Sequence, residues 1–167
     1  AHGLHPAVTV TSEVITGGPA EVLIQQSREA AVVVLGHRGL GGFASLLLGS
    51  VAVQVTAHAS SPVVVARGEP RGDGPVVVGV DGSPTSAAAV AFAADEAAWR
   101  KTSLVAVHAW AQPVSTGPGD MLPLVYDPDL LAAEEARVLA ESVAGLGATH
   151  PDVHVERHLV ESPAATV

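Results

Sequence analysis

Short apolar runs alternate along the chain with longer segments whose apolar positions recur at helical spacing. The runs are rich in Val and bounded by Gly, Pro or polar residues, which is the pattern of buried strands in a parallel sheet. They predict strands at residues 8–14, 31–35, 62–66, 75–80, 104–110 and 153–160, and the longer segments predict helices at 20–29, 49–60, 84–101 and 127–146. This alternation predicts an α/β fold in which helices flank a parallel sheet.

Breaks in the pattern predict where the chain divides. Residues 68–74 are polar and rich in Gly, so they predict a linker between a part at 1–67 and a part at 75–167. Residues 112–127 are rich in Pro and Gly and predict a long loop. Ser83 followed by Pro84 is a favourable start for the helix that comes after it.

The first and last predicted strands belong to an internal repeat. Its two copies differ by one residue of slip and read Val8-x-Val10-x3-Val14-x4-Pro19-Ala20 and Val153-x-Val155-x3-Leu159-x3-Pro163-Ala164. The repeat indicates that two related domains contribute to one chain.

Composition limits the classes of function. The chain has 167 residues, a formal net charge of −9, 3% aromatic residues and no cysteine. The acidic balance argues against a nucleic-acid surface, which needs clustered Lys and Arg. No apolar run approaches the ~20 residues of a membrane span, and the absence of cysteine excludes disulfides and is typical of a cytoplasmic protein.

The glycine-rich stretch that begins at Gly36 follows a predicted strand and leads into a predicted helix. Its spacing, Gly-x2-Gly-x9-Gly-Ser, is formed by Gly36, Gly39, Gly49 and Ser50. Glycines let the backbone approach a ligand closely, and the amides of Gly49, Ser50 and Val51 would open a helix, whose N-terminus attracts anions. The stretch therefore predicts a phosphate site; the alternative is a turn without a ligand. It matches neither the Walker phosphate loop nor the dinucleotide fingerprint.

Two sequence signatures together carry a family resemblance. The first is this glycine-rich spacing followed by Val-Ala-x2-Val-x2-His-Ala-x2-Pro-Val-Val-Val-Ala-Arg at residues 51–67, and the second is Val-Val-Val-Gly-Val-Asp-Gly-Ser at residues 76–83. They resemble, respectively, the nucleotide loop with the last helix and strand, and the first strand and turn, of the universal stress protein family. The resemblance covers nearly the whole chain and implies a Rossmann-like, adenine nucleotide alpha hydrolase-like fold.

The order of the two signatures implies a tandem protein. In the strand numbering of the family, the chain runs through strands 3, 4 and 5, a linker, and then strands 1, 2 and 3. We therefore expect the C-terminal part of a first domain at 1–67, joined to the N-terminal part of a second domain at 75–167. The chain is then expected to be a segment of a longer protein.

The same resemblance implies a nucleotide site made of two halves. Asp81 would bind the adenosine end of ATP, with or without Mg²⁺, and Ala109 would contact the adenine through its backbone. The remaining residues of the implied site are Gly79 and Val80 beside the adenosine, and Gly36, Gly39, Gly49, Ser50 and Val51 around the ribose and phosphates. The two halves belong to different domains, so they can meet only if the chain closes on itself or two chains exchange halves.

Several polar residues have plainer interpretations. Without the resemblance, Asp81 would be a turn residue after a strand, and Arg38 would contact either a phosphate or only solvent. His108 is expected to be a histidine at the edge of the core, and Glu134 and Glu135 are expected on a solvated helix face. His154 and His158 share one side of a strand but lack a third ligand for a metal.

These observations predict an adenine-nucleotide-binding module of the stress response that acts by signalling or scaffolding. The alternative is a related module that binds no nucleotide and works only through protein contacts. No enzyme class is supported, and slow ATP hydrolysis would lack a general base. The resemblance also implies a homodimer through the edge strand at 63–65 (Val63 to Val65), with no nucleic acid or membrane as partner.

Overall fold

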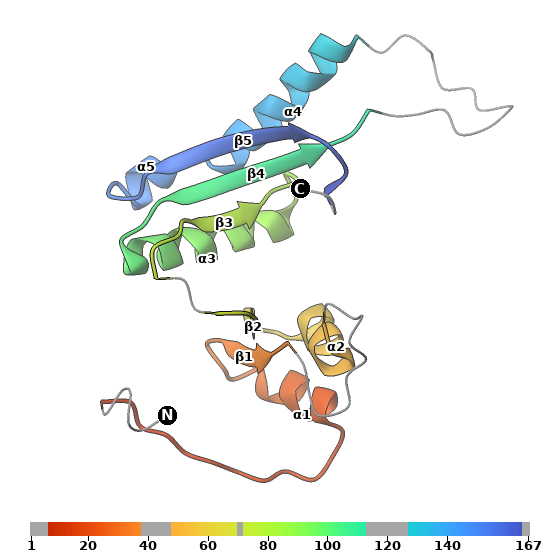
Figure 1. The fold of residues 1–167 in the computed structure, drawn as a ribbon, viewed down its shortest axis with the longest axis vertical. Helices are drawn as coiled ribbons and strands as arrows, with labels where there is room; N and C mark the ends of the chain where they lie inside the picture. Colours follow the sequence, from red (N-terminus) through yellow and green to blue (C-terminus); the bar gives the residue numbers. More distant parts are fainter. Residues whose placement is uncertain (1–6, 38–47, 70–71, 113–126, 165–167) are drawn as a thin grey trace, which may run out of the picture. The chain divides into compact units, whose positions relative to one another are not determined.

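The computed structural model describes residues 7–37, 48–69, 72–112 and 127–164. The chain divides into two compact units, Ala1–Pro70 and Arg71–Val167. Figure 1 shows the helices and strands of each unit. Both units combine parallel strands with flanking helices, which confirms the predicted α/β class.

The first unit contains two strands and two helices. Its elements in chain order are α1 (Pro19–Gln26), β1 (Val33–Gly36), α2 (Ser50–His58) and β2 (Val63–Ala66). The strands pair in parallel, from Val33 opposite Val63 to Gly36 opposite Ala66. A small aliphatic core of Ala20, Val33 and Val55 joins the helices to the sheet.

A buried serine connects the ends of the two helices in this unit. The hydroxyl of Ser27 donates a 2.7 Å hydrogen bond to the carbonyl oxygen of Ile24 and accepts one of 2.8 Å from the amide of Ser60. Because the Ser27 hydroxyl both donates and accepts a hydrogen bond, it fixes the end of α1 against the residues that follow α2.

The predicted strand at residues 8–14 is wrong. Residues 9–16 form no regular element, and the side chain of Val14 is fully exposed at 100%. A strand forms only where a neighbouring edge accepts its backbone hydrogen bonds. In the described structure residues 8–14 pair with no strand of either sheet: one sheet holds β1 and β2, and the other holds β3, β4 and β5.

The second unit is a three-stranded parallel sheet with its helices. Its elements are β3 (Val76–Gly79), α3 (Pro84–Arg100), β4 (Leu104–Trp110), α4 (Pro128–Ser142), α5 (Leu146–Thr149) and β5 (Val155–Glu161). The strands lie in the order β3-β4-β5, with Val76 opposite Leu104 and Leu104 opposite Val155.

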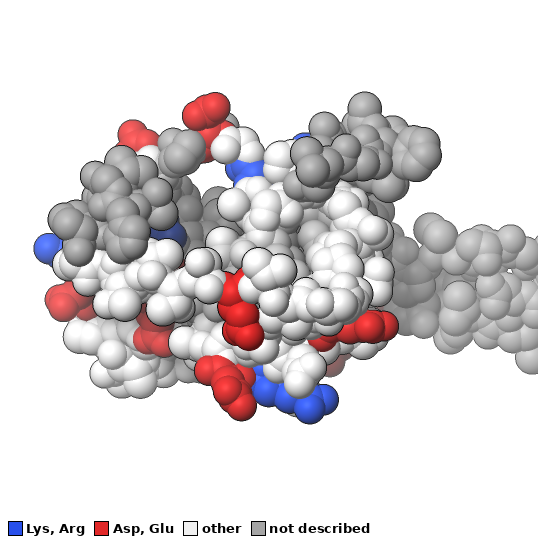
Figure 2. All heavy atoms as spheres, turned by 90° about the horizontal axis from the view of Figure 1, so that it is seen from below, with Lys and Arg blue, Asp and Glu red and all other residues white. Residues whose placement is uncertain are grey.

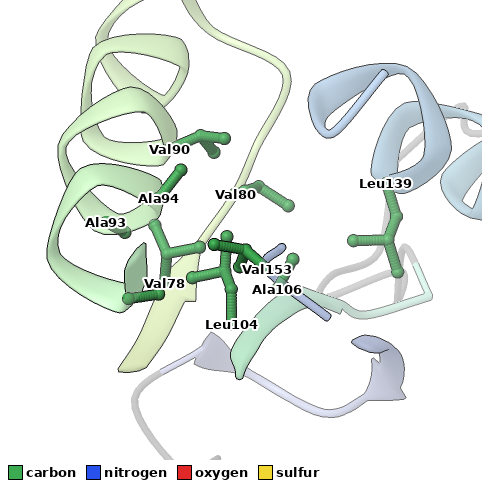
Figure 3. Packing of buried hydrophobic residues seen from close by; sticks show 10 residues of the cluster. Val78, Val80, Val90, Ala93, Ala94, Leu104, Ala106, Leu139 and Val153 are labelled. Carbon is green, nitrogen blue, oxygen red and sulfur yellow. The ribbon is translucent and has the colours of Figure 1, made fainter. Parts of the chain in front are cut away.

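Small aliphatic side chains fill the core of the second unit. Ala94 and Ala97 of α3 are completely buried, and they let the helix approach Leu104 and Ala106 of β4 closely. Figure 3 shows the buried side chains of β3 and β4 facing α3, while Leu139 enters the same cluster from α4. The low aromatic content of the sequence is consistent with this core.

One predicted helix end and one predicted burial pattern differ from the structure. The helix predicted over 127–146 ends at Ser142, because Gly145 adopts a left-handed conformation with φ of 89° and separates α4 from α5. The strands β1 and β2 are not buried throughout: their side chains alternate, and Val34 and Val64 are 62% and 41% exposed.

The distribution of basic side chains and the length of the helices bear on whether nucleic acid or a membrane could be a partner. On the face shown in Figure 2, the described Lys and Arg side chains are scattered and form no continuous basic patch. Among the described residues, no helix combines the length and apolar character needed to cross a bilayer.

Candidate functional site

The first group of predicted site residues lies between β1 and α2. Gly36 is the last residue of β1 and is exposed, while Gly49, Ser50 and Val51 lie at the start of α2. Arg38 and Gly39 lie outside the described residues. The described part of this group is therefore a strand end and a helix N-terminus.

Backbone hydrogen bonds fix the start of α2. The amide of Gly49 donates a 2.9 Å bond to the carbonyl oxygen of His37, whose own amide donates one of 3.1 Å to the carbonyl oxygen of Ala66. The His37 Nδ1 lies 3.3 Å from the same Ala66 oxygen. The amide of Gly49 is thus occupied in this structure and is not a free donor for an anion.

Among the described residues, no acceptor meets the other amides at this helix end, those of Ser50 and Val51. No side chain caps α2, because its N-cap residue is Gly49. The first amides of a helix have no partner within the helix itself, so those of Ser50 and Val51 point out of the N-terminus. This end of α2 carries a partial positive charge from the helix dipole.

The second group of predicted site residues lies where β3 ends. Gly79 is the last residue of β3, Val80 is buried, and Asp81 is exposed. The Asp81 carboxylate accepts a 2.9 Å hydrogen bond from the amide of Ser83. Hydrogen bonds from the side chain and backbone of Ser83 lower the pKa of Asp81, so this carboxyl group is ionised at neutral pH.

The turn after Asp81 starts α3 as the sequence predicted. The Ser83 hydroxyl accepts a 3.1 Å hydrogen bond from the amide of Ser86, and Pro84 is the first residue of the helix. Gly82 has φ of 76°, and a Cβ atom there would lie 3.0 Å from the Val138 Cγ1. The positive φ favours glycine at this turn, and any larger residue would also have to displace the Val138 side chain slightly.

The backbone N–H and C=O of Ala109 lie on the edge of β4 that faces β3, at a point beyond the end of β3. The amide of Val80 donates a 2.9 Å hydrogen bond to the carbonyl oxygen of Val107, which marks the β3 side of β4. Backbone groups alternate between the two edges of a strand, so the N–H and C=O of Ala109 point to the same side. Because the ladder with β3 ends at the pair Gly79–Val107, Ala109 lies past it.

No spacing in the sequence indicates the contact between His108 and Glu135, which lies beside this group. His108 is 6% exposed, and its Nε2 lies 2.5 Å from the carboxylate of Glu135 on α4. His108, predicted at the edge of the core, is buried. Glu135, predicted on a solvated helix face, keeps only 26% of its side chain exposed and contacts His108. Glu134, one residue earlier, is exposed and pairs with Arg137. Helical spacing puts the two adjacent glutamates on different sides of α4. Which of them faces the sheet becomes clear only from the position of His108 on β4.

His154, just before β5, and His158 within it flank a glutamate. The carboxylate oxygens of Glu156 lie 3.9 Å from the His154 Nε2 and 3.7 Å from the His158 Nε2. Within the described ranges, no group of three or more His, Asp or Glu side chains is arranged to hold a metal ion.

Strand pairing places the two groups of site residues in different sheets. Gly36 ends a strand of the β1–β2 sheet, whereas Gly79 and Ala109 belong to the β3–β4–β5 sheet. The described part of the predicted site therefore falls into two groups, called here the glycine-loop half (Gly36 and Gly49–Val51) and the aspartate half (Gly79–Asp81 and Ala109). The first offers amide donors and the second offers a carboxylate and a strand edge.

Comparisons with known proteins agree with the signatures in the sequence. The model of the universal stress protein family matches residues 1–67 and 74–167. A universal stress protein of Mycobacterium tuberculosis is 42% identical over 161 residues, which cover 92% of this chain and 50% of that protein. One of Mycolicibacterium smegmatis is 38% identical over 170 residues, covering 98% of this chain and 54% of that protein.

A solved structure shows the same architecture. The universal stress protein of Archaeoglobus fulgidus matches 92% of this chain and 50% of its own chain, with a TM-score of 0.58 and 23% identity. The chain spans about half the length of the curated relatives it matches. The family model matches both units, and the identity to curated members extends over nearly the whole chain, so this chain belongs to the universal stress protein family.

Proposed function

We propose that the protein containing this chain binds adenine nucleotide, in the form of ATP, and acts in the stress response by nucleotide-dependent signalling or scaffolding. Membership in the family supports the stress-response role. The observation that carries the nucleotide proposal is the uncapped N-terminus of α2, which directly follows the glycine-rich stretch.

The glycine-loop half suits a phosphate chain. The amides of Ser50 and Val51 lack helical acceptors, and the helix dipole places roughly half a positive charge at this end. An anion there gains hydrogen bonds and favourable electrostatics without any Lys or Arg. The residue before these donors is Gly49, which leaves the approach to the amides free of a side chain.

The aspartate half suits a nucleoside. The lowered pKa of Asp81 keeps its carboxylate ionised, so it can accept hydrogen bonds from ribose hydroxyl groups. The backbone N–H and C=O of Ala109 can pair with the edge of an adenine ring, as an adjoining strand would. Ligands of open parallel sheets bind at the carboxyl ends of the strands, where both Asp81 and Ala109 lie.

Each half-site needs a complement from outside its own sheet. In the proposed arrangement, the glycine-loop half is completed by the first strand of its own domain. The aspartate half is completed by the glycine loop of the second domain. Both complements would come from parts of the longer protein that this chain does not include, since the chain spans about half of its relatives.

Nucleotide recovery tests the proposal. The intact protein is purified without added nucleotide and denatured, and the released small molecules are identified by chromatography. Titration calorimetry with ATP and, as a control for base recognition, with GTP follows on the nucleotide-free protein. We expect released adenine nucleotide or measurable ATP binding that GTP does not reproduce. The proposal is refuted if the protein releases no nucleotide and titration with ATP produces no heat of binding.

A second candidate is a module that works only through protein contacts. It is favoured by β2, which in the described structure pairs with β1 alone and leaves its other edge unpaired. The same calorimetry separates the two candidates, because only the first requires ATP binding.

A further inference from the structure

A buried histidine joins the end of β3 to α4. The imidazole of His108 has its Nδ1 2.7 Å from the carbonyl oxygen of Val80 and its Nε2 2.5 Å from the carboxylate of Glu135. Val80 immediately precedes Asp81, and Ala109 immediately follows His108. The imidazole therefore contacts the backbone next to both members of the aspartate half-site.

We propose that His108 and Glu135 are positioning residues, which hold Asp81 and Ala109 in place for the nucleoside and make nucleotide binding at this half-site depend on pH. This inference rests on the nucleotide binding proposed above. Neither side chain needs to touch the ligand: Val80 is buried, and its carbonyl oxygen is the atom through which the pair acts on Asp81.

The hydrogen-bond partners fix the protonation of the imidazole. A carbonyl oxygen only accepts, so the Nδ1 must carry a proton and donate it to Val80. The Nε2 faces a carboxylate, to which it donates when the ring is the imidazolium cation. Burial disfavours that cation, but the hydrogen bonds to Glu135 and Val80 outweigh the burial and raise the pKa of His108.

The charged groups around the imidazole act in one direction. Glu135 on α4 and Asp81 after β3 both favour the cation. On β5, the residue in register with His108 is Leu159, and the buried face of α3 turns uncharged side chains toward the sheet. Within the described residues, no cation in contact with His108 offsets these two carboxylates.

Loss of the proton would open the bridge on the α4 side. Because the Nδ1 stays bound to the Val80 carbonyl, the proton leaves from the Nε2, and its lone pair then faces the Glu135 carboxylate. The bridge is therefore complete at pH values below the raised pKa of His108 and is lost as the pH rises through it. Nucleotide affinity at this half-site is therefore expected to be higher below the pKa of His108 and lower above it.

Variants of Glu135 separate this role from a general effect on folding. In Glu135→Gln, the amide donates to a neutral Nε2 and accepts from a protonated one, so the bridge persists at every pH. In Glu135→Leu, no bridge forms at any pH. Glu134→Gln is the matched control, since Glu134 is one residue earlier on α4 and is exposed.

The experiment measures ATP affinity by calorimetry in the intact protein between about pH 6 and pH 9, a range that begins below the ordinary pKa of histidine and extends well above it. All variants carry Gly49→Val, which disables the glycine-loop half so that the signal comes from the site containing Asp81. In the Gly49→Val parent and in Glu134→Gln, we expect ATP affinity to fall about tenfold as the pH rises. This is roughly the free energy of one charged hydrogen bond. Glu135→Gln should bind tightly at all pH values, and Glu135→Leu weakly at all of them.

Two outcomes would overturn the inference in different ways. If Glu135→Gln keeps the pH dependence of the parent, the bridge does not control the site, although nucleotide binding itself stands. If ATP binds to no variant, including protein with the native Gly49, the proposed function and this inference fail together.

Discussion

The amide of Gly49 donates a 2.9 Å hydrogen bond to the carbonyl oxygen of His37, and this bond joins the two ends of the glycine-rich stretch. His37 is itself bound to the last residue of β2 through its amide. These backbone hydrogen bonds thus hold the N-terminus of α2 at the carboxyl end of the β1–β2 sheet. A phosphate site there depends on shape and amide direction more than on charged side chains.

The substitution Gly49→Val tests this dependence. Gly49 has φ of −71° and ψ of 156°, an extended conformation that Val adopts readily, so the fold should be retained. The added side chain would occupy the approach to the amides of Ser50 and Val51. We expect ATP affinity at this half-site to fall by at least about tenfold, or roughly 1.4 kcal/mol, in calorimetry on the intact protein.

The matched control is Gly74→Val, the same exchange at a position where a new Cβ atom meets nothing within 4 Å. Its ATP affinity should equal that of the native protein. Equal affinities for Gly49→Val and Gly74→Val would show that α2 does not receive the phosphates.

Turnover of ATP is expected to be slow. Phosphoryl transfer is accelerated by positioned cations, a phosphate-loop Lys and a group that orients the nucleophile. The described part of the two half-sites offers amides, the Asp81 carboxylate and a strand edge instead. A phosphate-release assay on the intact protein should give rates far below the ~1 s⁻¹ of ordinary kinases. A rate near that value would mean that a catalytic group lies elsewhere in the protein.

The alternation of apolar runs and helical segments predicted most of the fold because each element has a local signal. Strand β4 matches its prediction residue for residue, and the Ser83–Pro84 start of α3 is confirmed with its capping hydrogen bond. The strand at 8–14 failed because its apolar pattern is only half of the requirement. Strand formation also needs a neighbouring strand to pair with, which the apolar pattern of one segment does not reveal. In the described structure residues 8–14 pair with no strand.

The candidate site was predictable in type but not in its contacts. Gly79 and Asp81 lie at a strand end, where a buried run followed by Asp-Gly-Ser should place them. The bridge from His108 to Glu135 spans 27 positions in sequence, and neither residue belongs to a recognisable spacing. Such a pair becomes visible only when β4 and α4 are packed together.

The N-cap of α3 gives a direct test of the turn after Asp81. In Ser83→Ala, the amide of Ser86 loses its side-chain acceptor, and Asp81 loses the hydroxyl that helps to lower its pKa. Unfolding by urea should show a loss of about 1 kcal/mol, the usual cost of a serine cap. Ser83→Asp, which retains an acceptor, should lose much less, and the exposed Thr85→Ala serves as control. A Ser83→Ala variant as stable as the native protein would show that the cap contributes nothing.

The unpaired edge of β2 leads to a prediction about assembly. In the described structure β2 pairs only with β1, so the backbone groups along its other edge have no strand partner. Val63 and Val65 are half-buried and Val64 is exposed, which makes this edge short, apolar and uncharged. Such an edge is open to pairing with another chain.

We expect two copies of the chain to pair through residues 63–65 across a two-fold axis, since an antiparallel contact of identical strands is self-complementary. Val64→Lys should weaken this dimer, because it places like charges opposite each other at the axis. Ala57→Lys on the exposed side of α2 adds the same charge away from the edge and should leave the dimer intact. Sedimentation equilibrium at tens of micromolar measures both. A native chain that is monomeric there, or a dimer that Val64→Lys leaves unchanged, would mean that the edge of β2 is covered in another way.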